Sequence, residues 1–135
     1  MKVQFIPVEL VHQTWPLVAG YLEDANLYGG GDYTLDQIRM LVSNGSWLLL
    51  VFVDDANKIC GAVTVSFSNM PNDRVAFITF IGGNLISSRN TFKQLSDVLK
   101  AHGATKIQGA VRGSVARLWR RYGFYERYAI VETKL

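Results

Sequence analysis

Two adjacent glycines and two adjacent serines stand where an apolar stretch of the sequence meets an amphipathic one. The stretch reads FIGGNLISS and runs from Phe80 to Ser88. A helix N-terminus carries unpaired N–H donors and a partial positive charge, and glycine lets an anion approach the backbone closely. The junction therefore predicts either a phosphate-binding loop or a glycine turn that leads into a serine-capped helix.

Other side chains with reactive chemistry are sparse. Cys60 lies in an apolar, strand-like pattern with no metal-ligand spacing around it, which indicates a buried and unreactive thiol. His12 and His102 lie near the ends of predicted helices, which favours surface positions over a role as a base. A single cysteine cannot form an internal disulfide and fits a reducing compartment. The sequence predicts no metal site.

Length and composition predict one globular domain over residues 1–135. The chain is 49% apolar and holds 3 Trp, 6 Tyr and 7 Phe, enough to build a sizeable core. No uninterrupted apolar run reaches the ~18 residues of a membrane span. The first residues lack the apolar core of a signal peptide. We therefore expect a cytoplasmic protein with no membrane partner.

The positive charge is concentrated toward the end of the sequence. Residues 100–135 hold eight Lys/Arg and two Asp/Glu, whereas residues 1–99 hold six and nine. A basic surface attracts anions, and arginines beside aromatic rings can bind nucleic acid. However, five of the arginines lie on or beside one predicted helix, whose apolar face contains Trp119 and Tyr122. This arrangement favours a solvated helix face with its aromatic residues packed in the core.

The hydrophobic periodicity predicts alternating strands and helices. Trp15, Val18, Ala19 and Leu22 follow the spacing of a helix, and Thr34 with Gln37 forms a capping-box signature. The predicted order is βααβββαβαβ. The elements are a strand at Val3–Val8, two helices, strands at Trp47–Val53, Lys58–Phe67 and Arg74–Ile81, a helix at Ser88–His102, a strand at Lys106–Val111, a helix capped by Ser114 and ended by Gly123, and a strand at Tyr128–Leu135.

This order resembles the fold of the GNAT acetyltransferase family over nearly the whole chain. RRYGF (Arg120–Phe124) is similar to the YEKxGF helix end of that family. The resemblance implies an α/β (α+β) fold with a mixed central sheet of about six strands and helices on both faces. A narrower similarity extends to small phage-encoded GNAT-like proteins, including an internal virion protein of short-tailed phages. It rests on Trp15, Tyr33-Thr34, Ile38, Leu41, Gly45, Gly82-Gly83, Arg112-Gly113, Arg117 and Gly123.

The resemblance implies acetyl-CoA as cofactor. In the family the third long strand ends in a bulge whose backbone pairs with pantetheine, and the following loop offers N–H groups to the pyrophosphate. Gly82-Gly83 permits such a bulge. Gly83 falls where the family has Arg or Gln, and Ile86 fits poorly at a small-residue position. The cofactor-binding candidates are Phe80, Ile81, Gly82, Gly83, Asn84, Ser87, Ser88 and Arg89.

The resemblance also bears on the catalytic acid. GNAT enzymes protonate the departing thiolate with a tyrosine, commonly four residues before the glycine that ends the last helix. That position holds Trp119, whose indole N–H is far too weak an acid, so Tyr122 is the catalytic candidate. The third long strand contains no carboxylate to act as base, and Asp73 lies in the turn before it. Proximity alone can still drive amine attack on a thioester.

Three functions remain open from the sequence. The first is acetyl-CoA-dependent acyl transfer to an unidentified amine, either a small molecule or a protein. The second is a catalytically inactive GNAT-fold protein that is part of a phage virion or binds a host protein. The third is a nucleic-acid or host-factor binding protein. If the gene belongs to a phage, we expect the protein in the host cytoplasm or in the virion.

Overall fold

The computed structural model describes residues 1–83 and 88–135. Within them no helix is long and apolar enough to cross a membrane. The elements follow the predicted order up to the last helix. They are β1 (Lys2–Ile6), α1 (Val8–Asn26), α2 (Leu35–Ser43), β2 (Leu48–Val53), β3 (Ile59–Asn69), β4 (Arg74–Gly83), α3 (Arg89–Ala101), β5 (Lys106–Gly109), α4 (Gly113–Trp119) and the 3-10 turn η1 (Arg120–Tyr122).

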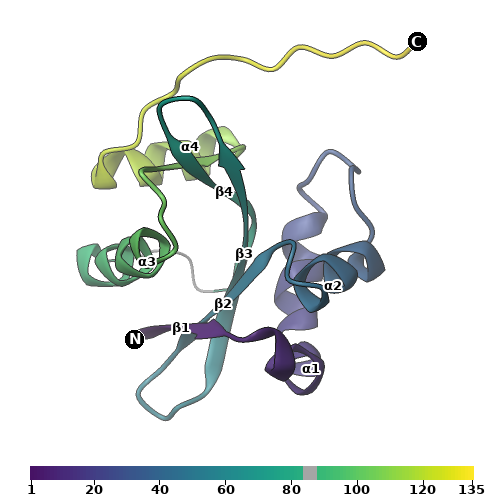
Figure 1. The fold of residues 1–135 in the computed structure, drawn as a ribbon, viewed down its shortest axis with the longest axis vertical. Helices are drawn as coiled ribbons and strands as arrows, with labels where there is room; N and C mark the ends of the chain where they lie inside the picture. The colour runs from purple at the N-terminus through teal and green to yellow at the C-terminus, as the bar shows by residue number, and fades with distance from the viewer. Residues whose placement is uncertain (84–87) are drawn as a thin grey trace.

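The strands form one mixed sheet in the order β1-β2-β3-β4-β5 (Figure 1). The pairs β1–β2, β2–β3 and β3–β4 are antiparallel, whereas β5 runs parallel to β4. A parallel pair requires a crossover connection, and α3 supplies it. The strands therefore lie side by side in the same order in which they follow one another in the sequence.

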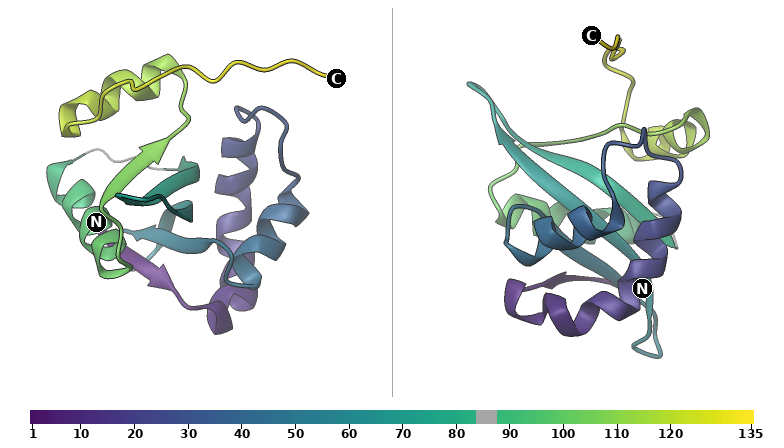
Figure 2. Two further views of the ribbon diagram at one scale, coloured as in Figure 1. Left: turned by 45° about the horizontal axis from the view of Figure 1, so that its top comes forward. Right: turned by 90° about the vertical axis from the view of Figure 1, so that its right-hand side faces the viewer.

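Helices cover both faces of the sheet, as the resemblance implied. Along β2 the side chains alternate: Leu49 and Val51 pack with α1 and α2, whereas Leu50 and Phe52 pack with α3 and α4. Trp119 belongs to this second cluster and is 2% exposed. Figure 2 shows the two helix pairs on opposite sides of the twisted sheet.

Most predicted helix ends are confirmed. Thr34 Oγ1 accepts from the Gln37 N–H at 3.2 Å, and Gln37 Oε1 accepts from the Thr34 N–H at 2.8 Å, which completes the capping box. Gly123 ends the last helical turn in the left-handed region at φ 91°. The Ser114 cap is wrong. The N–H groups of Val115 and Ala116 both donate to the Arg112 carbonyl, so Arg112 is the N-cap and the helix begins two residues too early for Ser114 to cap it.

The predicted closing strand at Tyr128–Leu135 is also wrong. The segment pairs with none of the described strands and all its residues are exposed, so the sheet has five strands rather than about six. Its β-branched and aromatic residues have the local propensity of a strand. A strand also requires a neighbouring edge, and this segment runs away from the body of the molecule (Figure 1).

Candidate functional site

β4 and β5, the last two strands of the sheet, part about halfway along β4. β5 pairs with β4 only from Val75 to Ile78, although β4 continues to Gly83. Within the described residues, the stretch Thr79–Gly83 therefore has a neighbouring strand on one side only, namely β3. We call this region, with Gly109 at the end of β5, the β4–β5 fork. Its open strand edge offers backbone N–H and C=O groups to a ligand.

A β-bulge at Thr79 marks the start of the fork. Thr64 of β3 pairs with Phe80 and the next residue, Val65, pairs with Ile78, which leaves Thr79 as an extra residue in β4. The Thr79 hydroxyl donates to the Thr64 carbonyl at 2.9 Å, and the two hydroxyl oxygens lie 2.6 Å apart. These bonds fix the bulge three residues before the glycine pair where the sequence permitted one.

The glycine pair allows close packing of α1 and β3. A Cβ atom on Gly82 would lie 2.8 Å from the carbonyl carbon of Tyr21 in α1, and closer still to its oxygen. A Cβ atom on Gly83 would lie 2.6 Å from Gly61 Cα in β3, and Gly83 adopts φ +83°. Protein backbone thus fills the space that the missing side chains leave. On the sides that face α1 and β3, the two glycines therefore leave no space for a ligand.

Ser88 begins α3 as its N-cap. Its Oγ accepts from the Thr91 N–H at 3.1 Å and lies 3.0 Å from the Thr91 hydroxyl, so the predicted serine cap is confirmed. Arg89 and Asn90 are the first helical residues, both exposed, and N–H groups at these positions point out of a helix. The candidates Asn84 and Ser87, with Ile86, lie outside the described residues.

Trp119 and Tyr122 both pack into the molecule. The outer ring of Trp119 lies against Gly109, where an added Cβ would come within 3.0 Å of Cζ3. Its indole Nε1 is buried and finds no hydrogen-bond partner in the described part of the chain. Tyr122 is half-buried and stacks on Phe92 of α3 with ring centroids 5.4 Å apart. The residue at the acid position therefore lies beside the fork as a core tryptophan, and Tyr122 lies at the α3–α4 contact.

The titratable groups near the sheet have structural partners. Asp73 accepts a hydrogen bond from Thr105 and forms a 3.1 Å ion pair with Lys106; the Thr105 bond, then Lys106, lower the pKa of the Asp73 carboxyl. A lowered pKa makes this carboxylate a weaker base. His102 Nδ1 lies 2.9 Å from the Val98 carbonyl. The described residues contain no group of three metal-ligating side chains.

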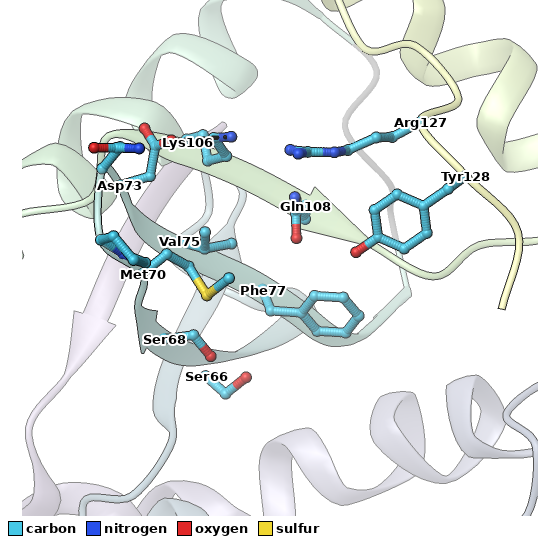
Figure 3. A pocket seen from close by; sticks show the side chains of 12 residues that line it. Ser66, Ser68, Met70, Asp73, Val75, Phe77, Lys106, Gln108, Arg127 and Tyr128 are labelled. Atoms are coloured by element: carbon cyan, nitrogen blue, oxygen red, sulfur yellow. Dashed lines mark ion pairs between the residues drawn. The ribbon is translucent and has the colours of Figure 1, made fainter.

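A shallow cavity of about 380 Å³ lies beside β5 on the sheet face that carries α1 and α2 (Figure 3). Phe77, Lys106 and Gln108 line it from the sheet, and Arg127 and Tyr128 line it from the chain after α4. Phe77 and Gln108 directly precede Ile78 and Gly109, the last residues that pair before the fork. The cavity has no local signature in the sequence, because its walls come from segments distant in sequence.

No protein-family model and no curated protein matches the sequence. Solved structures match its fold. A tetramutant of the BH1408 protein from Bacillus halodurans is 18% identical with a TM-score of 0.69, and each chain is covered completely. Ribosomal-protein-alanine N-acetyltransferase from Brucella melitensis biovar Abortus 2308 is 13% identical, again with full coverage of both chains and a TM-score of 0.68.

A third match is the aminoglycoside acetyltransferase meta-AAC0020 from an uncultured soil metagenomic sample, solved in complex with sisomicin. It is 12% identical with a TM-score of 0.69, and the match covers 99% of this chain and 95% of that one. At such low identity these likenesses concern the fold alone. The predicted fold class is confirmed: the chain has the GNAT acetyltransferase fold, with five strands.

Proposed function

We propose that this protein is an N-acyltransferase that uses acetyl-CoA. The observation that carries the proposal is the β4–β5 fork, where β4 beyond the bulge at Thr79 has one edge without a neighbouring strand among the described residues. An extended chain can pair with such an edge through main-chain hydrogen bonds, as an added strand does. Pantetheine is extended and carries two amide groups, so it fits this edge.

The residues around the fork fit the cofactor in two places. The backbone of Phe80, Ile81, Gly82 and Gly83 would pair with pantetheine, and the N-terminus of α3 with Ser88 and Arg89 would face the pyrophosphate. Asn84 and Ser87 belong to the same candidate site. When bound, the cofactor supplies an activated acetyl thioester. The Arg89 guanidinium adds a positive charge that a pyrophosphate would neutralise.

The chain's own groups would act mainly by positioning. The cavity beside β5 gives an acceptor amine a route to the fork from the α1 and α2 face. Holding an amine against a thioester supplies much of the rate of such a reaction without a strong base. The Tyr122 hydroxyl is the proposed proton donor to the departing thiolate. From its stacked position on Phe92 it must turn toward the fork to serve this role.

A second candidate function is binding without catalysis. The buried Trp119 favours it, because this side chain replaces the expected tyrosine and is a poor proton donor. A protein of this kind would bind a virion component or a host protein, as the similarity to phage-encoded proteins implies. Acetyl-CoA could still bind at the fork, so turnover rather than binding separates the two functions.

The deciding experiment measures acetyl-CoA binding and thiol release on the same samples. At ~100 times its dissociation constant, acetyl-CoA should stabilise the fold by ~2.7 kcal/mol, which a thermal melt and a calorimetric titration both detect. A panel of amines then tests turnover. Turnover supports the transferase, and binding without turnover supports the second function. If acetyl-CoA neither binds nor shifts the melting temperature, the cofactor assignment is wrong.

A substitution at the helix cap tests the proposed location. Ser88→Asp keeps a good N-cap residue but adds a negative charge at the start of α3, so it should weaken acetyl-CoA binding without unfolding the helix. Gln13→Glu adds the same charge on the exposed surface of α1 and serves as the matched control. If the two variants bind acetyl-CoA with equal affinity, the pyrophosphate does not bind at the N-terminus of α3.

A further inference from the structure

The segment Tyr128–Leu135, which we call the exit segment, has the sequence of a strand but no partner. It contains Tyr128, Ile130 and Val131, which are 71%, 79% and 91% exposed. Several large apolar side chains exposed together on one short segment indicate a contact surface. None of its residues forms a hydrogen bond to another described element.

The sheet has a free edge that matches this segment. β5 pairs with β4 on one side, and its other side has no neighbouring strand among residues 1–83 and 88–135. An unpaired edge presents a row of N–H and C=O groups that recruits another strand. A natural protein normally covers such an edge, and no helix or loop of the described chain pairs with it.

The start of the exit segment is held in place. Phe124 packs on Trp119 with ring centroids 4.9 Å apart, and Arg120 pairs with Glu126 at 3.0 Å. Tyr128 still lines the cavity next to Gln108, whereas residues 129–135 are exposed. Figures 1 and 2 show the chain continuing outward from this point and ending away from its own sheet.

We propose that the exit segment of one copy adds as a strand to the free edge of β5 in a second copy. The exchange is reciprocal, because each copy carries both a segment to give and an edge to cover, and such an interface closes with two-fold symmetry. The segment is apolar on both faces at Tyr128–Val131, which suits a strand covered on both sides. This inference does not depend on the proposed activity.

The oligomeric state of the full chain is the first test. Light scattering during gel filtration should give twice the monomer mass of 15.1 kDa. Val131→Asp introduces a charge into the proposed interface and should yield a monomer, at least a tenfold loss in dimer affinity. Leu27→Asp makes the same kind of change at a residue 76% exposed near the end of α1, and should remain dimeric. A monomeric parent protein, or a dimeric Val131→Asp variant, overturns the proposal.

Cross-linking separates exchange from folding of the segment onto its own sheet. Two differently tagged chains lacking Cys60 through Cys60→Ala are co-expressed, one carrying Ile130→Cys and the other Gln108→Cys. A short bis-maleimide should join the two tags in one covalent dimer. If instead a chain with both cysteines cross-links only within itself, the exit segment completes its own sheet and the exchange is excluded. Melting curves of each variant verify that it is folded.

Discussion

At the residue scale, Gly82 shows how one missing side chain sets the distance between a helix and the sheet. The carbonyl of Tyr21 occupies the place where a Cβ atom would stand. Glycine at this junction was open to two interpretations in the sequence, phosphate binding and turn formation. Neither includes contact with a helix sixty residues earlier, because local spacing carries no information about such a neighbour.

Gly82→Ala should therefore destabilise the fold strongly. The added methyl group overlaps backbone rather than a movable side chain, so we expect a loss at the upper end of the usual overpacking cost, about 3 kcal/mol. Gly20→Ala is the matched control, because nothing lies within 4 Å of its added Cβ and it lies inside α1. That control should gain ~0.5–1 kcal/mol from helix propensity. Denaturant unfolding measures both, and equal effects would contradict the packing role of Gly82.

Tyr122→Phe tests the proposed acid. If the protein transfers acetyl groups and Tyr122 donates the proton, turnover should fall by roughly 10²–10⁴ while acetyl-CoA affinity stays nearly constant. The ring stack on Phe92 survives the change, so stability should be preserved. Tyr125→Phe removes the same hydroxyl from a residue that is 79% exposed and should leave turnover unchanged. Unaltered turnover in folded Tyr122→Phe would exclude this hydroxyl.

At the element scale, the sequence predicted most helices and strands because each carries its own periodicity and caps. Thr34 and Ser88 are local signals of this kind, and both caps are confirmed. The resemblance implied a bulge at the end of β4, but its position at Thr79 could not be predicted, because the Thr79 hydroxyl bonds to β3 and the surrounding residues have an ordinary strand pattern. The exit segment failed as a strand for the same reason: pairing depends on a partner edge.

Leu95 tests the packing of α3 on the sheet. It is fully buried in the cluster that α3 and α4 form with the sheet. Leu95→Ala should cost ~2–5 kcal/mol through the cavity it creates. Leu17→Ala on α1 removes the same atoms from a residue that is 61% exposed and should change stability by less than about 0.5 kcal/mol. Similar losses in the two variants would contradict this packing.

Asp73 ties the turn between β3 and β4 to the start of β5. Its hydrogen bond from Thr105, with that from Lys106, lowers the carboxyl pKa below the ordinary 3.8. A lowered folded-state pKa stabilises the fold above 3.8, and this stabilisation is lost as pH falls through the folded value. The melting temperature of Asp73→Asn should thus lie below that of the parent at pH 7 and converge with it below pH 3.8. A difference in melting temperature that stays constant between pH 7 and pH 3 would show that ionisation of Asp73 does not stabilise the fold.

At the scale of the whole molecule, the two faces of the sheet are covered by different parts of the chain. α1 and α2 precede β2, whereas α3 and α4 follow β4 (Figure 1). The sequence predicted helices on both faces, and the alternating burial along β2 confirms it. It did not predict where β4 and β5 part, because that point depends on the register between strands thirty residues apart.

This division has a consequence for the nascent chain. When residue 83 leaves the ribosome, the four antiparallel strands and the helices of one face are complete. Each of these strands pairs with the strand that was synthesised just before it. The other face still exposes Leu50, Phe52 and Val63, because α3 and α4, which cover them, have not yet been synthesised. At ~5–20 residues per second, translation needs several more seconds to complete these helices. During that interval the ribosome carries a half-covered sheet. Chaperones should bind a chain arrested at residue 83 and release one extended past Tyr122.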